Sequence, residues 1–274
     1  MERLTGKVAI VTGAGRGVGK ATALLLAREG AHVVVNDLDV DEAAATVNEI
    51  ILSGHSALVC AGSVTDPLFP DQLMQAALNA YGQIDILINN AGYIWNGAMH
   101  NHSDEQWQAM LDIHVTAPFK ILKSFSTWLR QQAKKEIAET GRAVCRKIVN
   151  VSSVSGTNGS ATQIAYSSGK AAVIGLTKTL AKEWGRYNVT VNCVAFGHID
   201  TRLTQPYTEE PPSIRVDDKD LKVGLSEAMV QSVTQMAPLG RVGQPEDGAG
   251  AIYLFCIPES DFITGEVLTC SGGA

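Results

Sequence analysis

The sequence predicts an α/β fold built on a doubly wound parallel sheet, because short β-branched runs alternate with amphipathic helical patterns along the chain. The runs are apolar on both sides, as expected of parallel strands that helices cover on both faces. Their number predicts a seven-stranded sheet in a single domain over residues 1–274. The predicted strands are residues 7–11, 32–35, 57–60, 84–88, 147–151, 189–194 and 266–269.

Helical patterns fill most of the connections, and the clearest are residues 21–29, 41–52, 70–81 and 165–184. Residues 131–146 are rich in charge and predict a polar helix extension followed by a surface loop, away from any chemistry. Residues 201–237 contain three prolines and predict a long irregular connection. Such connections often cover a ligand, so we expect a substrate loop here, with a flexible insertion as the alternative.

Composition narrows the class of partner. The chain has 274 residues, of which 45% are hydrophobic, and a formal net charge of -6, with Lys and Arg scattered among acids. No surface for nucleic acid or anionic lipid is therefore expected. The five separated cysteines predict reduced thiols, with no metal site. The first residues lack the apolar stretch of a signal peptide, and no run reaches the ~18 residues of a membrane span, so we expect a cytoplasmic protein.

A glycine-rich stretch, TGAGRGVG at residues 12–19, follows the first predicted strand and precedes a helical pattern. Glycines let the backbone approach a pyrophosphate, whose charge is stabilised by the free N–H groups and positive end of the helix. A glycine-rich turn is weak evidence by itself, but the first strand-to-helix junction is the place that dinucleotide binding requires. The candidate cofactor residues here are Gly13, Arg16, Gly17, Val18 and Gly19.

Asp37 ends the second predicted strand, about 20 residues after the glycines. A carboxylate there can accept the ribose hydroxyls of NAD and would repel the 2′-phosphate of NADP. An aspartate that merely begins a turn is the alternative. Arg16 works in the opposite direction if its guanidinium holds that phosphate rather than lying in solvent. We expect NAD(H) as the cofactor, with NADP less favoured.

Tyr166 and Lys170 place a phenol and an ammonium four residues apart on one face of the predicted helix 165–184. Such a pair is not rare by chance, so the pair alone is weak evidence and its context matters. The preceding strand runs to Ser153, and a parallel sheet gathers its site at strand ends. The ammonium would lower the pKa of the phenol. Tyr166 could then exchange a proton with an alcohol or ketone while Ser153 donates to the substrate oxygen.

Taken in order, these motifs resemble the classical short-chain dehydrogenase/reductase family over nearly the whole chain. The matching stretches are residues 12–19, NNAG at 89–92, Ser153 followed by YSSGK at 166–170, PLGR at 238–241 and QPED at 244–247. The resemblance implies a Rossmann-like fold, hydride transfer between NAD(P)(H) and a secondary alcohol or ketone, and a homotetramer. It also implies that Tyr166 is the general acid/base, Ser153 holds the substrate oxygen, and Lys170 binds the nicotinamide ribose and lowers the pKa of the tyrosine.

The resemblance implies further cofactor contacts along the strand ends. They are Leu38, Ser63, Val64, Asn90, Ala91, Gly92, Gly197, Ile199 and Thr201. Ser63 stands where an acid often meets the adenine ring, and a hydroxyl can still form a hydrogen bond there. Ile199 and Thr201 would hold the nicotinamide carboxamide.

The sequence departs from the family pattern at a few positions. His114 stands where an asparagine usually supports a bound water near the lysine, and a similar histidine occurs in dehydrogenase units of multifunctional β-oxidation proteins. We expect the His114 imidazole to be neutral and to support the same bound water, which would give it a part in catalysis. A histidine that only packs within its helix is the alternative. Phe196 replaces a proline and could border the nicotinamide. Cys270 replaces an aspartate without an evident redox meaning.

The likeness to multifunctional proteins favours 3-hydroxyacyl or 3-oxoacyl thioesters as substrates, ahead of steroids, polyols or small alcohols. A protein that binds NAD without catalysis and acts as a regulator is the alternative function. Such a protein would be expected to lack Ser153, Tyr166 or Lys170, and all three are present. Trp95 and Met99 could line a substrate pocket or belong to the core. His100 and His102 could face substrate or solvent.

Overall fold

The computed structural model describes residues 2–207, 209–216 and 219–274. Its centre is a seven-stranded sheet in the order β11-β6-β5-β4-β1-β2-β3, with every neighbouring pair parallel. The strands are β1 Val8–Val11, β2 His32–Val35, β3 Ala57–Val59, β4 Ile86–Asn89, β5 Arg146–Ser153, β6 Val189–Phe196 and β11 Val267–Cys270. The predicted seven-stranded Rossmann-like sheet is confirmed. The strand order reverses at β1 and β4, the place where such sheets bind ligands.

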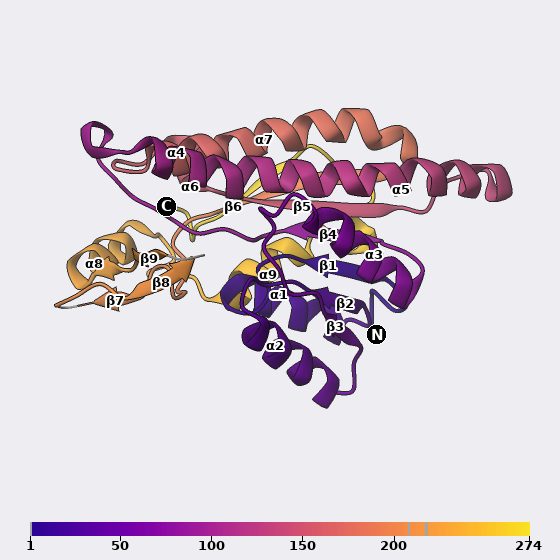
Figure 1. Ribbon diagram of the computed structural model, residues 1–274, viewed down its shortest axis with the longest axis horizontal. Helices are drawn as coiled ribbons and strands as arrows, with labels where there is room; N and C mark the ends of the chain where they lie inside the picture. The colour runs from indigo at the N-terminus through magenta and orange to yellow at the C-terminus, as the bar shows by residue number, and fades with distance from the viewer. Residues whose placement is uncertain (1, 208, 217–218) are drawn as a thin grey trace.

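Helices cover both faces of the sheet (Figure 1). The helices of the described residues are α1 Gly17–Arg28, α2 Val40–Leu52, α3 Phe69–Tyr81, α4 Asp104–Leu111, α5 Ala117–Thr140, α6 Val154–Asn158, α7 Ile164–Trp184, α8 Glu227–Met236 and α9 Pro245–Tyr253, of which α8 lies beside β7 and β10 and not on the central sheet. Helices α1, α2 and α9 pack on one face, while α3, α5 and α7 pack on the other (Figure 1). Within the described ranges, no helix combines the length and apolar character needed to span a membrane.

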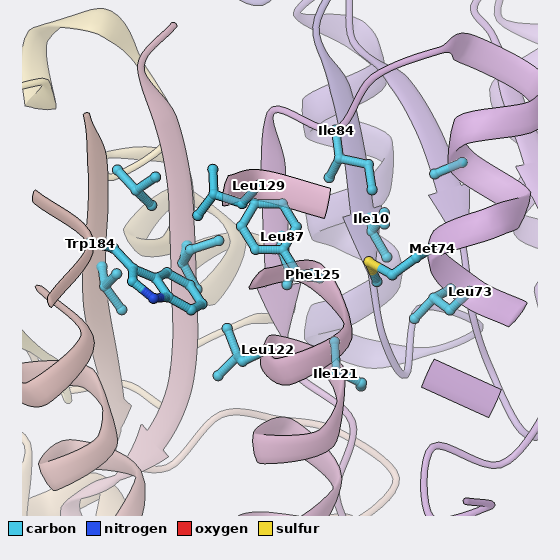
Figure 2. Close-up of a cluster of buried hydrophobic side chains, with 14 of the residues drawn as sticks. Ile10, Leu73, Met74, Ile84, Leu87, Ile121, Leu122, Phe125, Leu129 and Trp184 are labelled. Atoms are coloured by element: carbon cyan, nitrogen blue, oxygen red, sulfur yellow. The ribbon is translucent and has the colours of Figure 1, made fainter. Parts of the chain in front are cut away.

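Two apolar clusters fill these layers, one on each face of the sheet. In the cluster under α3, α5 and α7, the fully buried Phe125 ring lies 5.8 Å from the Trp184 ring (Figure 2). The other cluster joins the sheet to α1, α2 and α9 through residues such as Leu26 and Ile252. Because both faces of the sheet are covered, the inner strands β1, β4 and β5 are buried along their whole length, while the edge strands β3 and β11 are partly exposed.

Residues 131–146 differ from the prediction at their end. Helix α5 continues to Thr140 and is closed by Gly141 in the left-handed conformation, as a helix extension with a following loop requires. Arg146, however, begins β5 with only 2% of its surface exposed, and it pairs with the buried Glu136. The prediction of a surface loop was wrong for this residue, because a carboxylate ten positions earlier on α5 makes burial of the guanidinium tolerable.

Residues 201–237 are not irregular, contrary to the prediction. Strands β7 Pro206–Tyr207 and β10 Leu225–Ser226 form a short parallel pair. Strands β8 Ser213–Val216 and β9 Lys219–Lys222 form an antiparallel hairpin, and α8 follows. The prolines hid the period-two alternation that buries one side of this hairpin. Positions 208, 217 and 218 of the segment lie outside the described residues.

Candidate active site

The glycine-rich turn needs its glycines for clearance. Gly13 has a φ of 62°, and a Cβ there would lie 2.8 Å from the Cα of Ala91. A Cβ on Gly19 would collide with the carbonyl oxygen of Gly13. Helix α1 begins at Gly17, so its free N–H groups point out of this close-packed turn. The turn therefore has the form that holds a pyrophosphate.

Thr12, which the sequence reasoning missed, ties the ends of β1 and β4 together. Its hydroxyl oxygen accepts from the backbone N–H groups of Asn90 at 3.0 Å and Ala91 at 3.1 Å, and it donates to the carbonyl of Ile88. The Asn90 amide donates in turn to the carbonyls of Thr12 at 2.9 Å and Gly13 at 3.0 Å. Asn90 thus braces the glycine turn from beneath. A threonine directly before the first glycine was the available signal.

Asp37 and Arg16 lie beside the glycine turn. One carboxylate oxygen of Asp37 accepts from the N–H of Gly15 at 2.8 Å, which fixes the side chain after β2. The guanidinium of Arg16 pairs with Asp39 at 2.9 Å and with Glu42 at 2.8 Å. Arg16 is therefore held by two carboxylates and does not lie loose in solvent.

The remaining predicted contacts near this end are arranged around β3. The Asn36 amide donates to the carbonyl of Gly62 at 3.0 Å and so fixes the backbone before Ser63. The Ser63 hydroxyl lies 2.7 Å from the hydroxyl of Thr65. Val64 is only 6% exposed and its side chain belongs to the core, so its backbone is what it can offer a ligand. Leu38 stays 48% exposed beside Asp37.

The end of β6 supplies the opposite side of the turn. A Cβ on Gly17 would meet the methyl group of Thr201 at 3.4 Å, so this loop lies directly against the start of α1. Gly197 donates its N–H to the carbonyl of Cys270 at 2.9 Å. Ile199 is buried and forms a bridge with Gly243. Together with the glycine turn and Asp37, these residues form a cradle that fits a dinucleotide.

Phe196 lies in the layer beneath this cradle. A Cβ on Gly248 would come within 3.0 Å of Val18 on α1 and 3.3 Å of the Phe196 ring. The ring therefore occupies the space where α1 and α9 approach each other. The structure thus shows Phe196 in the packing between α1 and α9.

Ser153, Tyr166 and Lys170 come together where β5 ends and α7 begins. The Ser153 hydroxyl lies close enough to the Tyr166 phenol for a side-chain interaction that lowers the pKa of Tyr166. The Lys170 Nζ atom lies 5.8 Å from the centre of the Tyr166 ring and donates to the carbonyl of Val151 at 2.9 Å. The Ser152 hydroxyl donates to the carbonyl of Lys170 at 2.7 Å, which seats the helix on the strand. The three residues predicted from the motif thus share one site.

The protonation of this pair differs from the expectation. Burial raises the pKa of Tyr166 to about 12, although the nearby Ser153 side chain lowers it. Burial also lowers the pKa of Lys170 to about 8. The expected lowering of the tyrosine pKa by the lysine is therefore wrong for this structure. The reason is desolvation, which disfavours the charged forms of both Tyr166 and Lys170 and so raises the pKa of the tyrosine and lowers that of the lysine.

His114 lies in a single π-helical turn, Asp112–Thr116, between α4 and α5. It is buried, and burial followed by the nearby Lys170 holds its pKa well below the usual value, although a hydrogen bond to the backbone of Tyr93 raises it. The imidazole is thus neutral, and its Nε2 donates to the carbonyl of Tyr93 at 2.8 Å. Its ring meets the Tyr166 ring edge-on at 5.1 Å.

A cavity of about 10 Å³, the size of one water molecule, lies beside these groups. Its lining includes Asn89, His114 and Lys170. Among the described residues, the Nδ1 of His114 and the Oδ1 of Asn89 are buried without a hydrogen-bond partner. The Asn89 amide donates at 2.8 Å to Asn150, which donates at 2.9 Å to Thr177. Two buried acceptors and a buried ammonium therefore face one small space.

The loop after β4 contains the four residues for which the sequence allowed either a substrate-facing or a structural position, and their surroundings differ. Trp95 packs against the core and against the hairpin of β8 and β9. Met99 is 76% exposed, and His100 is exposed as well. Both ring nitrogens of His102 are buried, without a partner among the described residues. Of the two residues expected to line a substrate pocket, Trp95 packs against both the core and the hairpin, whereas Met99 is exposed.

Comparison with known proteins agrees with this geometry. A model of the short chain dehydrogenase family matches residues 7–212. The chain is 39% identical to a 3-oxoacyl-[acyl-carrier-protein] reductase of Synechocystis, over 100% of this chain and 98% of the relative. It is 35% identical to the (2S)-[(R)-hydroxy(phenyl)methyl]succinyl-CoA dehydrogenase subunit BbsD of Thauera aromatica, over 97% and 96%.

Among solved structures, the chain is similar to a 7α-hydroxysteroid dehydrogenase complexed with NADH and 7-oxo glycochenodeoxycholic acid. The TM-score is 0.84 and the identity 29%, and the match covers 99% of this chain and 95% of the other. Fold, motifs and relatives coincide. The chain therefore belongs to the short-chain dehydrogenase family and is an oxidoreductase that acts on CH–OH groups.

Proposed function

We propose that this protein interconverts a secondary alcohol and a ketone with NAD(H), with Tyr166 as the general acid/base. The observation that carries the proposal is the convergence of Tyr166 and Ser153 at the end of β5, with Lys170 one helical turn away and its Nζ 5.8 Å from the centre of the Tyr166 ring. Two hydroxyl groups that converge beside a dinucleotide cradle can both reach the oxygen of one substrate.

The high pKa of Tyr166 favours ketone reduction. A phenol with a pKa of about 12 is protonated at neutral pH and remains a stronger acid than the alcohol that forms. Tyr166 would therefore donate its proton to the alkoxide-like oxygen, while Ser153 donates a hydrogen bond to the same oxygen. The nicotinamide, when bound, supplies the hydride. Oxidation of an alcohol requires Tyr166 to release its proton first, so that direction gains at higher pH.

Lys170 and His114 would support this exchange through the small cavity. One water there could donate to the Oδ1 of Asn89 and the Nδ1 of His114 and accept from the Nζ of Lys170. Both buried acceptors would then be satisfied. In this proposal Lys170 also binds the nicotinamide ribose, and His114 acts as a positioning residue for the water and for the Tyr166 ring.

The charges around Asp37 favour NAD over NADP. A 2′-phosphate at this place would meet the carboxylates of Asp37, Asp39 and Glu42. Arg16 is already paired with two of them, and Arg202 is the further guanidinium in their field. The acids outnumber the bases, which disfavours a second phosphate. The similar steroid dehydrogenase, whose complex contains NADH, adds support.

The relatives favour a thioester substrate. One is named for an acyl-carrier-protein substrate and one for a succinyl-CoA substrate. A 3-oxoacyl thioester is therefore our first candidate, and a steroid, from the structural neighbour, is the second. We further propose a cytoplasmic homotetramer of single-domain subunits, with residues 201–237 as the substrate loop. Light scattering coupled to gel filtration tests the assembly state.

The direct test is oxidation of NADH and NADPH, followed at the absorbance of the reduced nicotinamide, against 3-oxoacyl-CoA, a 7-oxo steroid and small ketones. We expect turnover with NADH and a 3-oxoacyl thioester. Failure with every ketone would contradict the proposed reaction. A clear preference for NADPH would contradict the assignment of the cofactor alone.

A further inference from the structure

A small hydrophobic cluster, which we call the hairpin cluster, joins the 201–237 segment to the loop after β4. Its buried members are Ile214 on β8, Leu221 on β9 and Val223, at 3%, 5% and 6% exposure. Tyr93 and Trp95 pack against these three side chains. The hairpin therefore has a fixed apolar attachment, and two aromatic residues form it.

The same two aromatic residues reach the proposed catalytic tyrosine. Tyr93 and Trp95 also pack against the core cluster to which Tyr166 is attached. The carbonyl of Tyr93 accepts from His114 at 2.8 Å, and the His114 ring lies against the Tyr166 ring. A continuous line of contacts thus runs from the hairpin, through the aromatic pair, to the residue that would serve the substrate oxygen.

Backbone hydrogen bonds hold the base of the hairpin on the other side of the site. Val223 donates to the carbonyl of Pro212 at 2.8 Å, and Gly224 donates to the carbonyl of Leu203 at 3.0 Å. Leu203 follows Thr201, which lies against the start of α1. The hairpin is therefore fastened at both ends, to the cofactor cradle and to the aromatic pair.

We propose that Tyr93 and Trp95, backed by Ile214 and Leu221, determine substrate specificity and select ketones whose carbonyl carbon bears a bulky apolar group. An aromatic or alicyclic ring or a long alkyl chain that extends from the reacting carbon toward the hairpin would lie against this wall. A methyl group would not reach it. The discrimination would follow the apolar area removed from water. The inference rests on the proposed function, because it concerns the substrate of that reaction.

Two β-keto esters test the inference, since ethyl acetoacetate carries a methyl group where ethyl benzoylacetate carries a phenyl ring. We expect Trp95→Ala to lower kcat/KM for the benzoyl ester by about 10- to 100-fold and to leave the acetoacetate largely unchanged. Met99→Ala is the matched control, because Met99 lies in the same loop but is 76% exposed and outside the hairpin cluster. It should change neither value.

A second variant reaches the wall from the hairpin side. The double substitution Ile214→Ser and Leu221→Ser leaves both aromatic residues in place and should cause the same selective loss for the benzoyl ester. Binding of NADH, followed by its fluorescence, confirms that each variant is folded. Agreement between the two variants would show that the hairpin and the aromatic pair act together.

The outcomes separate the inference from the proposed function. If the wild-type protein reduces the esters but the ratio of the two kcat/KM values is unchanged in both variants, the inference is overturned and the proposed function stands. A gain with the benzoyl ester in Trp95→Ala also overturns it, since Trp95 would then obstruct the ring. If the wild-type protein reduces no ketone at all, the proposed function and the inference both fail.

Discussion

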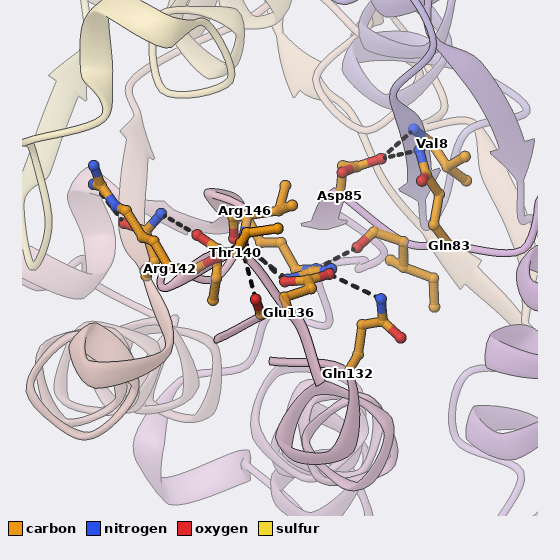
Figure 3. Close-up of polar contacts among 12 residues, drawn as sticks. Val8, Gln83, Asp85, Gln132, Glu136, Thr140, Arg142 and Arg146 are labelled. Atoms are coloured by element: carbon orange, nitrogen blue, oxygen red, sulfur yellow. Dashed lines mark hydrogen bonds and ion pairs between the residues drawn. The ribbon is translucent and has the colours of Figure 1, made fainter. Parts of the chain in front are cut away.

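At the amino-terminal edge of the sheet, the buried carboxylate of Glu136 accepts from Arg146, from the N–H of Val144 at 2.9 Å and from Gln132 at 2.9 Å (Figure 3). At the carboxyl-terminal edge, the buried Lys170 has no carboxylate partner among the described residues. His114 and Asn89 each keep a buried acceptor free of described partners there.

The Glu136 network and the Lys170 site therefore differ in how completely their polar groups are paired within the protein. Asp85 shows the same saturation at the amino-terminal edge, since one of its oxygens accepts from the N–H of Val8 and from Gln83, both at 2.9 Å (Figure 3). Fully paired groups fix a single arrangement of the chain. Polar groups without protein partners cost stability, but they remain available to a substrate, a cofactor or a water.

The largest effect is expected from breaking the amino-terminal network. Glu136→Gln leaves the guanidinium of Arg146 buried without its counter-charge, so the free energy of unfolding should fall by about 3–5 kcal/mol. Urea titration measures this value. Glu139→Gln, on the exposed side of the same helix, should change it by less than about 0.5 kcal/mol. A loss as small as that of the control would show that the pair contributes little.

The same substitution predicts a pH dependence. Burial alone would raise the pKa of Glu136, but hydrogen bonds from Arg146, Val144 and Gln132 lower it from 4.5 to about 2. The ionised carboxylate therefore stabilises the fold fully above pH 4.5, and this contribution is lost as the pH falls toward 2. The difference in urea midpoint between the wild-type protein and Glu136→Gln should shrink over that interval. A constant difference would contradict the assignment.

A substitution at the carboxyl-terminal ends of the strands should lower the turnover number and leave the free energy of unfolding nearly unchanged. Tyr166→Phe removes the proton donor while keeping the ring that packs against His114, so kcat should fall by at least about 100-fold with NADH binding nearly intact. Tyr81→Phe, which removes a remote hydroxyl near Ser56, is the control and should retain activity. Full activity in Tyr166→Phe would refute the assigned acid/base.

The smallest effect concerns the cofactor. Asp37→Ala should lower kcat/KM for NADH by about 10-fold, because the ribose loses a charged acceptor, while NADPH improves little. Asp41→Ala removes an exposed acid at the start of α2 and should leave the preference unchanged. Equal values for NADH in the wild-type protein and Asp37→Ala would transfer the preference to other residues.

Sequence reasoning succeeded where the signal is local. The glycine turn, the strands and the spacing of Tyr166 and Lys170 each lie within a short stretch, and the structure has those elements at those places. The pairing of Glu136 with Arg146 could not be predicted, because it depends on α5 folding back onto β5. The pKa of Tyr166 also escaped prediction, since spacing reveals a nearby charge but not the loss of solvent around it.

The two ion pairs of Arg16, with Asp39 and with Glu42, affect any redesign of the protein toward NADP. Deleting Asp37 clears space for a phosphate, but the only cation within the glycine turn stays engaged elsewhere. Conversion to NADP would need a second substitution, at Asp39 or Glu42, that removes one carboxylate and frees the guanidinium of Arg16. Under the proposed preference for NAD(H), the choice of coenzyme would depend on several charges together, so a substitution at Asp37 alone would not convert the protein to NADP.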